Sequence, residues 1–180
     1  MIVLLGGASG VGKSQISYRL AAHLGVPLVE VDDIVEALQA MTTPEQLPLL
    51  HYWNTQPHPT DPQQIVELQI AIAEALVPAV DAVIANHLET GTPVVIEGDY
   101  LLPTPGVKTV ILHERDEAQI ARNYLAREPE AGDQSGRALV SRMYGDWLAG
   151  RARAAGAAVV EARPWSDVFE RVLKEVVDGG

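Results

Sequence analysis

The chain has 180 residues, of which 47% are hydrophobic and 21% charged, with a formal net charge of −11 and no cysteine. Length and apolar content predict one domain over residues 1–180 with a single hydrophobic core. The missing cysteines exclude disulfides and thiolate metal sites, and the acidic balance argues against nucleic acid as a partner, because phosphate backbones are bound by basic surfaces.

No apolar run approaches the ~20 residues that a membrane-spanning helix requires. The first residues, Met1–Leu5, lack the basic flank of a signal peptide. The sequence therefore predicts no membrane partner, and a reducing cytoplasm is the expected location. It carries no indication of an oligomeric state.

Five short runs rich in Val, Ile and Leu predict β-strands, and helical patterns separate them. The strands are expected at Ile2–Leu5, Pro27–Val31, Pro93–Ile96, Val107–Leu112 and Ala157–Val160. Strands that alternate with helices are typical of the α/β class, in which helices cover both faces of a parallel sheet.

The helices carry their own start and stop signals. The first one follows a glycine-rich segment and is expected to end at Gly25. Asp61 and Pro62 supply an N-cap and a first-turn proline for a long helix, which Pro78 is expected to kink or break. The last helix is expected at about 166–177.

A proline-rich insert at about 41–62 is unusually long for a connection inside a compact domain, and such connections usually have a function. It contains Tyr52 and Trp53. These two aromatic residues are candidate substrate contacts, and they are equally candidates for side chains that only pack the insert against the core.

A second segment, at about 115–137, is polar and contains glycine, proline and several arginines. It is expected to form a small lid. Arginine side chains suit the charge that spreads over a transferring phosphoryl group, so Arg122 and Arg127 are candidate catalytic residues. The alternative for each is an ordinary solvated arginine on a surface helix.

The segment after the first strand matches the phosphate-binding pattern G-x-x-x-x-G-K-[ST] at every position. It consists of Gly7, Ala8, Ser9, Gly10, Val11, Gly12, Lys13 and Ser14. Glycines let the backbone turn its N–H groups toward phosphate oxygens, and the following helix adds its positive end. Lys13 is expected at the β- and γ-phosphates and Ser14 at Mg²⁺, so ATP and Mg²⁺ are the expected cofactors.

Carboxylates follow two predicted strands, at the edge where an open parallel sheet binds its ligands. Asp32 is a candidate base for a substrate hydroxyl, with a structural or Mg²⁺-water role as the alternative, and Asp33 is expected to cap the next helix. Glu97 is a candidate metal ligand and Asp99 a candidate substrate contact, with a solvated turn as the alternative. Which of Asp32, Glu97 and Asp99 is the base stays open at this point.

Arg163 follows the fifth predicted strand, where a nucleotide base often lies in this architecture, so it is a candidate nucleotide contact. Its segment continues with Pro164 and Trp165. The histidines His23, His87 and His113 show no spacing that is typical of metal ligands.

The sequence resembles the small P-loop kinases of the nucleoside-monophosphate-kinase-like group. Its phosphate loop, together with Ile96-Glu97-Gly98, is similar to the 2-phosphoglycerate kinase type, and Val31–Ala37 resembles a strand-end segment of chloramphenicol phosphotransferase. The resemblance implies a P-loop NTPase fold with five parallel strands in the order 2-3-1-4-5 and an arginine-bearing lid. It also implies phosphoryl transfer from ATP, with Asp32 as the base.

Two hypotheses of different classes follow. The first is a kinase that transfers the γ-phosphoryl group of ATP to a hydroxyl of a small molecule; a toxin-like or antibiotic-modifying kinase would differ from it only in the acceptor. The alternative is a nucleotide-binding regulatory ATPase or switch without a small-molecule acceptor. The acceptor of the kinase is not identified by any pattern, because its specificity would reside in the irregular insert and lid.

Overall fold

The computed structural model describes residues 1–178, in which five parallel strands form one sheet in the order β2-β3-β1-β4-β5. The strands are β1 (Ile2–Gly6), β2 (Leu28–Glu30), β3 (Val94–Gly98), β4 (Lys108–His113) and β5 (Ala158–Glu161). The predicted α/β class, the number of strands and their order are confirmed.

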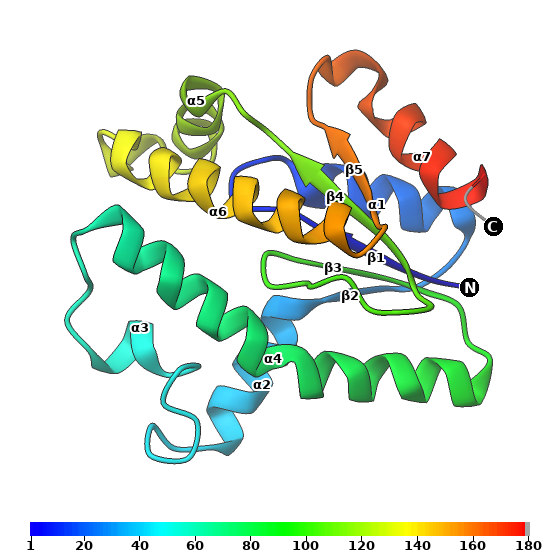
Figure 1. Cartoon of the computed structure of the whole chain (residues 1–180), viewed down its shortest axis with the longest axis horizontal. Coiled ribbons are helices and arrows are strands. Elements are labelled where there is room, and N and C mark those ends of the chain that lie inside the picture. Colours follow the sequence, from blue (N-terminus) through cyan, green and yellow to red (C-terminus); the bar gives the residue numbers. More distant parts are fainter. Residues whose placement is uncertain (179–180) are drawn as a thin grey trace.

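Helices cover both faces of this sheet, as Figure 1 shows. The α-helices are α1 (Lys13–Leu24), α2 (Val31–Met41), α3 (Tyr52–Thr55), α4 (Pro62–Thr90), α5 (Glu117–Arg127), α6 (Ser135–Ala154) and α7 (Val168–Asp178), and the 3₁₀ helices are η1 (Pro129–Ala131) and η2 (Trp165–Asp167). Helices α1 and α7 pack together on one face, and α4 and α6 pack together on the other. Helix α5 packs against α6 beyond the carboxyl ends of the strands.

Strand β1 is buried on both sides, because successive side chains of a strand point to opposite faces. Val3 and Leu5 belong to the apolar cluster that includes Leu20 of α1. Ile2 and Leu4 belong to a second cluster, which includes the buried side chains of α4. The central strand is thereby fixed from both faces, and so is the phosphate loop that follows it.

Helix α4 is a continuous helix of 29 residues whose N-cap Asp61 accepts a hydrogen bond from the Gln64 amide, as the sequence predicts. The helix continues through Pro78, and its axis changes direction partway along (Figure 1), so a kink and not a break is found. By length and composition alone it could cross a membrane, and 28% of its most apolar window is buried. Glu74 and Asp81 interrupt this helix, so the sequence contains no uninterrupted apolar run near ~20 residues. One such helix is weak evidence of a membrane span, because core helices of soluble proteins pass the same test.

Strand β2 ends before the predicted position, and α2 begins at Val31 with Glu30 as its N-cap residue. No side chain caps this helix, so the predicted capping role of Asp33 is wrong; the aspartate lies inside the first turn. Val31 is fully buried against Gly98, where an added Cβ would lie 2.5 Å from the Val31 Cβ. This close approach brings the first turn of α2, including Asp32, to the end of β3.

Candidate active site

A cavity of about 520 Å³ lies at the carboxyl ends of the strands. Its walls come from the phosphate loop, the ends of β2 and β3, helix α5, and the segment after β5. The predicted site residues that line it are Ser9, Gly10, Gly12, Lys13, Ser14, Asp32, Glu97, Asp99, Arg127 and Arg163. The topology thus brings together side chains that are up to 154 positions apart in the chain, counted from Ser9 to Arg163.

The phosphate loop has the backbone that the motif predicts. Gly10 and Gly12 have positive φ angles of 81° and 96°, which residues other than glycine rarely adopt. Gly12 is the N-cap residue of α1, so the first free N–H groups of that helix face the cavity. The ring of Trp165 lies directly on Gly12, where an added Cβ would approach it to 2.5 Å.

Lys13 is buried beneath the loop and makes two polar contacts. Its ammonium group donates to the Ala8 carbonyl oxygen at 3.1 Å and forms an ion pair with Asp99. Burial lowers the pKa of Lys13, but the negative charges of Asp99 and Glu97 outweigh it, so the net pKa is raised. The lysine is therefore a fixed positive charge between the phosphate loop and the end of β3.

Glu97 is a buried carboxylate at the end of β3, next to two serine hydroxyls of α1. Ser14 and Ser17 donate to its Oε2 atom at 3.5 and 3.4 Å. Burial raises the pKa of Glu97, and the charge of Lys13 opposes that rise. Among the described residues no group of three His, Cys, Asp or Glu side chains could hold a metal ion. A single carboxylate with a hydroxyl nevertheless fits Mg²⁺, which takes few protein ligands beside phosphate and water.

Four carboxylates, which we call the acidic wall, line the cavity from the β2–β3 side: Glu30, Asp32, Glu97 and Asp99. The parallel pairing of β2 with β3 sets Glu30 opposite Glu97. Asp32 is exposed, yet partial desolvation and the charge of Asp99 raise its pKa, while Lys13 opposes the rise. An exposed carboxylate whose pKa is raised is suited to accept a proton from a bound hydroxyl.

The two predicted lid arginines differ in their position. Arg127 lines the cavity and pairs with Glu128 at 3.0 Å. Arg122 is paired with Asp116 at 3.4 Å and is not among the lining residues. Helix α5, which carries both, is attached to the phosphate loop by Asn123, whose amide donates to the Gly10 carbonyl at 2.7 Å.

The segment after β5 forms the opposite wall. Arg163 donates to the buried carboxylate of Glu114 at 2.8 Å and lies 5.5 Å from the ring centre of Trp165. Trp165 therefore presents an aromatic surface beside the loop, where a nucleotide base could stack. The sequence marks this residue only weakly, because its contact with Gly12 joins opposite ends of the chain.

The aromatic residues of the insert do not line the cavity, and Trp53 contacts Tyr100, the residue next to Asp99. Tyr52 and Trp53 pack edge to face at 5.7 Å on α3, and neither lines the cavity. Burial and the charge of Asp99 raise the pKa of Tyr100 to about 12, and a hydrogen bond with Trp53 partly opposes this rise. Tyr144 of α6 donates to the Asp99 carbonyl at 3.0 Å. The structure thus favours a packing role for Trp53, and neither Tyr100 nor Tyr144 was predicted from the sequence.

Known proteins resemble the chain in sequence. It is 26% identical to the 2-phosphoglycerate kinase of Methanocaldococcus jannaschii over 99% of its own length and 63% of that protein. It is 34% identical to the 2-phosphoglycerate kinase of Pyrococcus furiosus over 57% of its length and 36% of that protein. The chain therefore spans less than two thirds of these relatives. No protein-family model matches it.

Solved structures resemble it in fold. A gluconokinase from Sinorhizobium meliloti has a TM-score of 0.51 at 20% identity, covering 98% of this chain and 91% of its own. A shikimate kinase from Acinetobacter baumannii, solved with shikimate, has a TM-score of 0.57 at 13% identity, covering 99% and 93%. The predicted resemblance to P-loop small-molecule kinases is confirmed.

Proposed function

We propose that this protein is an ATP-dependent phosphotransferase that transfers the γ-phosphoryl group to a hydroxyl of a small molecule. The observation that carries the proposal is one cavity that residues of the phosphate loop, Lys13 and Ser14 among them, line together with Asp32 and Asp99. The kinase names of the relatives support the same reaction type.

In this proposal the triphosphate of ATP lies along the loop, and Lys13 exchanges its contact with Asp99 for the β- and γ-phosphates. Ser14 and Glu97 would hold Mg²⁺, directly or through water. The metal would supply neutralisation of the charge on the phosphate oxygens. The base of the nucleotide would lie against Trp165, with Arg163 beside it.

The acceptor would enter beside the acidic wall and direct a hydroxyl toward the γ-phosphorus. Asp32 accepts the hydroxyl proton as the new oxygen–phosphorus bond forms, and the bond between the γ-phosphorus and the bridging oxygen breaks, so that ADP leaves. Asp99 accepts a hydrogen bond from the acceptor once Lys13 has moved to phosphate. Positioning and electrostatics supply most of the rate in such a reaction.

Residues 115–137 would act as a lid over the cavity. The lid and the insert at 41–62 would belong to the same single domain. Arg127 already lines the cavity, and closure of α5 would turn its guanidinium from Glu128 to the transferring phosphoryl group. Arg122 would have to leave Asp116 to do the same. The polar contact between Asn123 and the loop would couple that motion to the bound phosphates.

The experiment that tests the proposal measures ADP formation by the purified protein with ATP·Mg²⁺, with and without hydroxyl compounds. The first panel contains 2-phosphoglycerate, gluconate and shikimate, which the names of the similar proteins suggest, together with uncharged sugars and polyols. A kinase gives acceptor-dependent ADP and a phosphorylated product. A rate that never rises above basal hydrolysis would favour the regulatory ATPase instead.

A further inference from the structure

We propose that the acceptor is an uncharged or positively charged hydroxyl compound, such as a polyol or an amino alcohol, and that Asp99 is a residue that excludes anionic acceptors. This inference rests on the proposed function, because it concerns the acceptor side of the same cavity. It differs from what the names of the similar proteins would suggest, since 2-phosphoglycerate carries both a phosphate and a carboxylate.

The sheet order separates the charges of the cavity. Strands β2 and β3 lie on one side of β1 and bring the acidic wall, whereas β4 and β5 lie on the other side. Arg163 follows β5, and Arg127 belongs to α5, which follows β4. The phosphate loop, at the end of β1, lies between the two sides. An acceptor on the side of Asp32 therefore meets carboxylates, while the nucleotide meets the arginines.

The acidic wall has little compensating charge. Among the lining residues that the structure describes, Lys13 is the cation that contacts the wall, through Asp99. When ATP binds, that lysine is needed at the phosphates, so Asp99 keeps its negative charge toward the acceptor. Bound ATP with Mg²⁺ adds net negative charge of its own, and an anionic acceptor would be repelled by both.

Arginines elsewhere around the site are already paired with carboxylates. Arg163 is bonded to Glu114, and Arg137 of α6 to Glu128 at 2.8 Å. Arg142 of α6 is bonded to Glu117 and Asp146. An acceptor phosphate or carboxylate would have to break one of these pairs before it found a cation. A hydroxyl or ammonium group, in contrast, finds acceptor oxygens on Asp32, and on Asp99 once Lys13 has moved to the phosphates.

The test uses acceptors that share a carbon skeleton and differ in charge. The three-carbon set is 2-phosphoglycerate, glycerate, glycerol and 3-amino-1,2-propanediol; the six-carbon set is gluconate, glucitol and glucosamine. The kcat/KM for each is measured from ADP formation at saturating ATP·Mg²⁺. We expect the uncharged and cationic members to exceed the anionic ones by at least about tenfold, less so as salt is raised, because salt screens charges near the surface.

Two failures are distinguishable. If the anionic member of either set is the best acceptor, the charge inference is wrong, but the protein is a kinase. If no member of either set raises ADP formation above basal hydrolysis, the proposed kinase function loses its support, and this inference is lost with it.

Variants test the role of Asp99 separately. Asp99→Asn should shift the ratio of anionic to uncharged kcat/KM toward the anion by about tenfold, whatever happens to the absolute rate. Glu175→Gln removes the same charge at the opposite end of the sheet and should leave the ratio unchanged. Glu30→Gln, which removes another carboxylate of the wall, is the second variant in case the first does not fold. An unchanged ratio in the folded wall variants overturns the assignment.

Discussion

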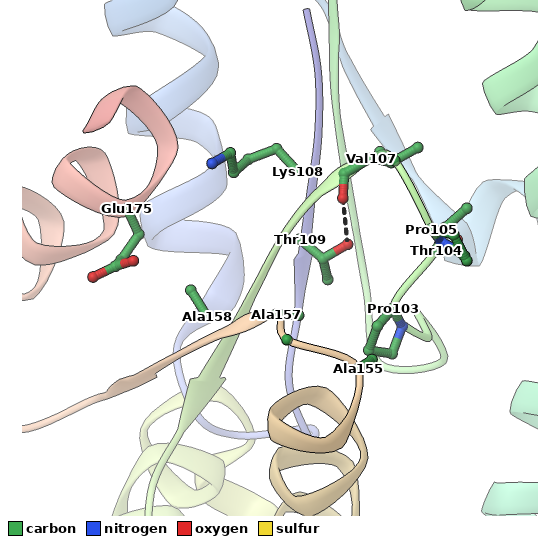
Figure 2. Close-up of a pocket in the computed structure, with 12 residues that line it drawn as sticks. Pro103, Thr104, Pro105, Val107, Lys108, Thr109, Ala155, Ala157, Ala158 and Glu175 are labelled. Atoms are coloured by element: carbon green, nitrogen blue, oxygen red, sulfur yellow. Dashed lines mark hydrogen bonds between the residues drawn. The ribbon is translucent and has the colours of Figure 1, made fainter. Parts of the chain in front are cut away.

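Two cavities lie at opposite ends of the sheet, and the larger one is not the candidate active site. The cavity at the carboxyl ends holds about 520 Å³, whereas the hollow at the amino ends of β4 and β5 holds about 640 Å³. Figure 2 shows the latter, lined by prolines, alanines and Val107, with Lys108 and Glu175 as its charged residues. The Thr109 hydroxyl there already donates to the Val107 carbonyl at 3.2 Å. Charge and free hydrogen-bonding groups, not volume, distinguish the candidate active site.

The polarity of a parallel sheet explains this difference. Helices that follow the strands begin at the carboxyl edge, so their free N–H groups and partial positive charge gather there. Helices α1 and α2 both begin at this edge, and α6 ends near the amino-end hollow at Ala154. A site for an anionic nucleotide is therefore expected at the first hollow and not at the second.

The largest expected effect is on catalytic rate, and it should distinguish Lys13 at the candidate active site from Lys108 at the other hollow. Lys13→Ala removes the buried cation of the phosphate loop and should lower acceptor-dependent ADP formation by about 10³-fold, with weaker ATP binding measured by calorimetry. Lys108→Ala at the other hollow should change the rate by no more than about twofold, as surface substitutions usually do. Comparable losses in both variants would mean that the contrast between the hollows is wrong.

The next effect concerns the base. Asp32→Asn keeps the shape of the side chain but cannot accept the hydroxyl proton, so transfer should fall by about 10²-fold while ATP affinity stays near that of the wild type. Single-turnover phosphoryl transfer and ATP titration measure the two quantities separately. Full transfer activity in the variant would make Asp32 structural, and the role of base would then pass to Asp99 or to no side chain.

A smaller effect concerns the packing that positions Asp32. Gly98→Ala introduces a methyl group against Val31 and should destabilise the fold by about 1–3 kcal/mol, measured by urea denaturation. Gly150→Ala is the matched control inside α6, where an added Cβ meets no atom within 4 Å. It should be neutral or stabilise by up to about 1 kcal/mol. Equal stability of the two variants would argue against a tight contact at the end of β3.

The smallest effect is a pH dependence of stability that arises from the acidic wall. Because the pKa values of Asp32 and Glu97 are raised in the folded protein, the native state binds more protons than the unfolded state above their ordinary values of 3.8 and 4.5. The contribution of these groups to the unfolding free energy should therefore increase as the pH falls from neutrality toward those values. Asp32→Asn should reduce this increase. An identical pH profile for wild type and Asp32→Asn contradicts the prediction.

Local sequence patterns predicted much of the framework. The phosphate loop, the strand order and the acidic residues at the strand ends could be predicted because each depends on residues close together in the chain or on a known family pattern. The start of α2 was misplaced, since the burial of Val31 against Gly98 is a contact between distant segments. Asn123 escaped prediction and Trp165 was only weakly indicated for the same reason: their partners, Gly10 and Gly12, lie more than one hundred positions away.

The ion pair between Lys13 and Asp99 connects the proposed nucleotide site, which uses Lys13, with the proposed acceptor site, which uses Asp99. A nucleotide that draws Lys13 to its phosphates leaves a carboxylate without its counter-ion on the acceptor side. Thermodynamic linkage then requires the converse: a cationic or hydrogen-bond-donating acceptor that satisfies Asp99 strengthens the hold of Lys13 on the nucleotide by the same factor. Donor and acceptor would thus bind with positive cooperativity through a single pair of side chains, with no large movement of the fold.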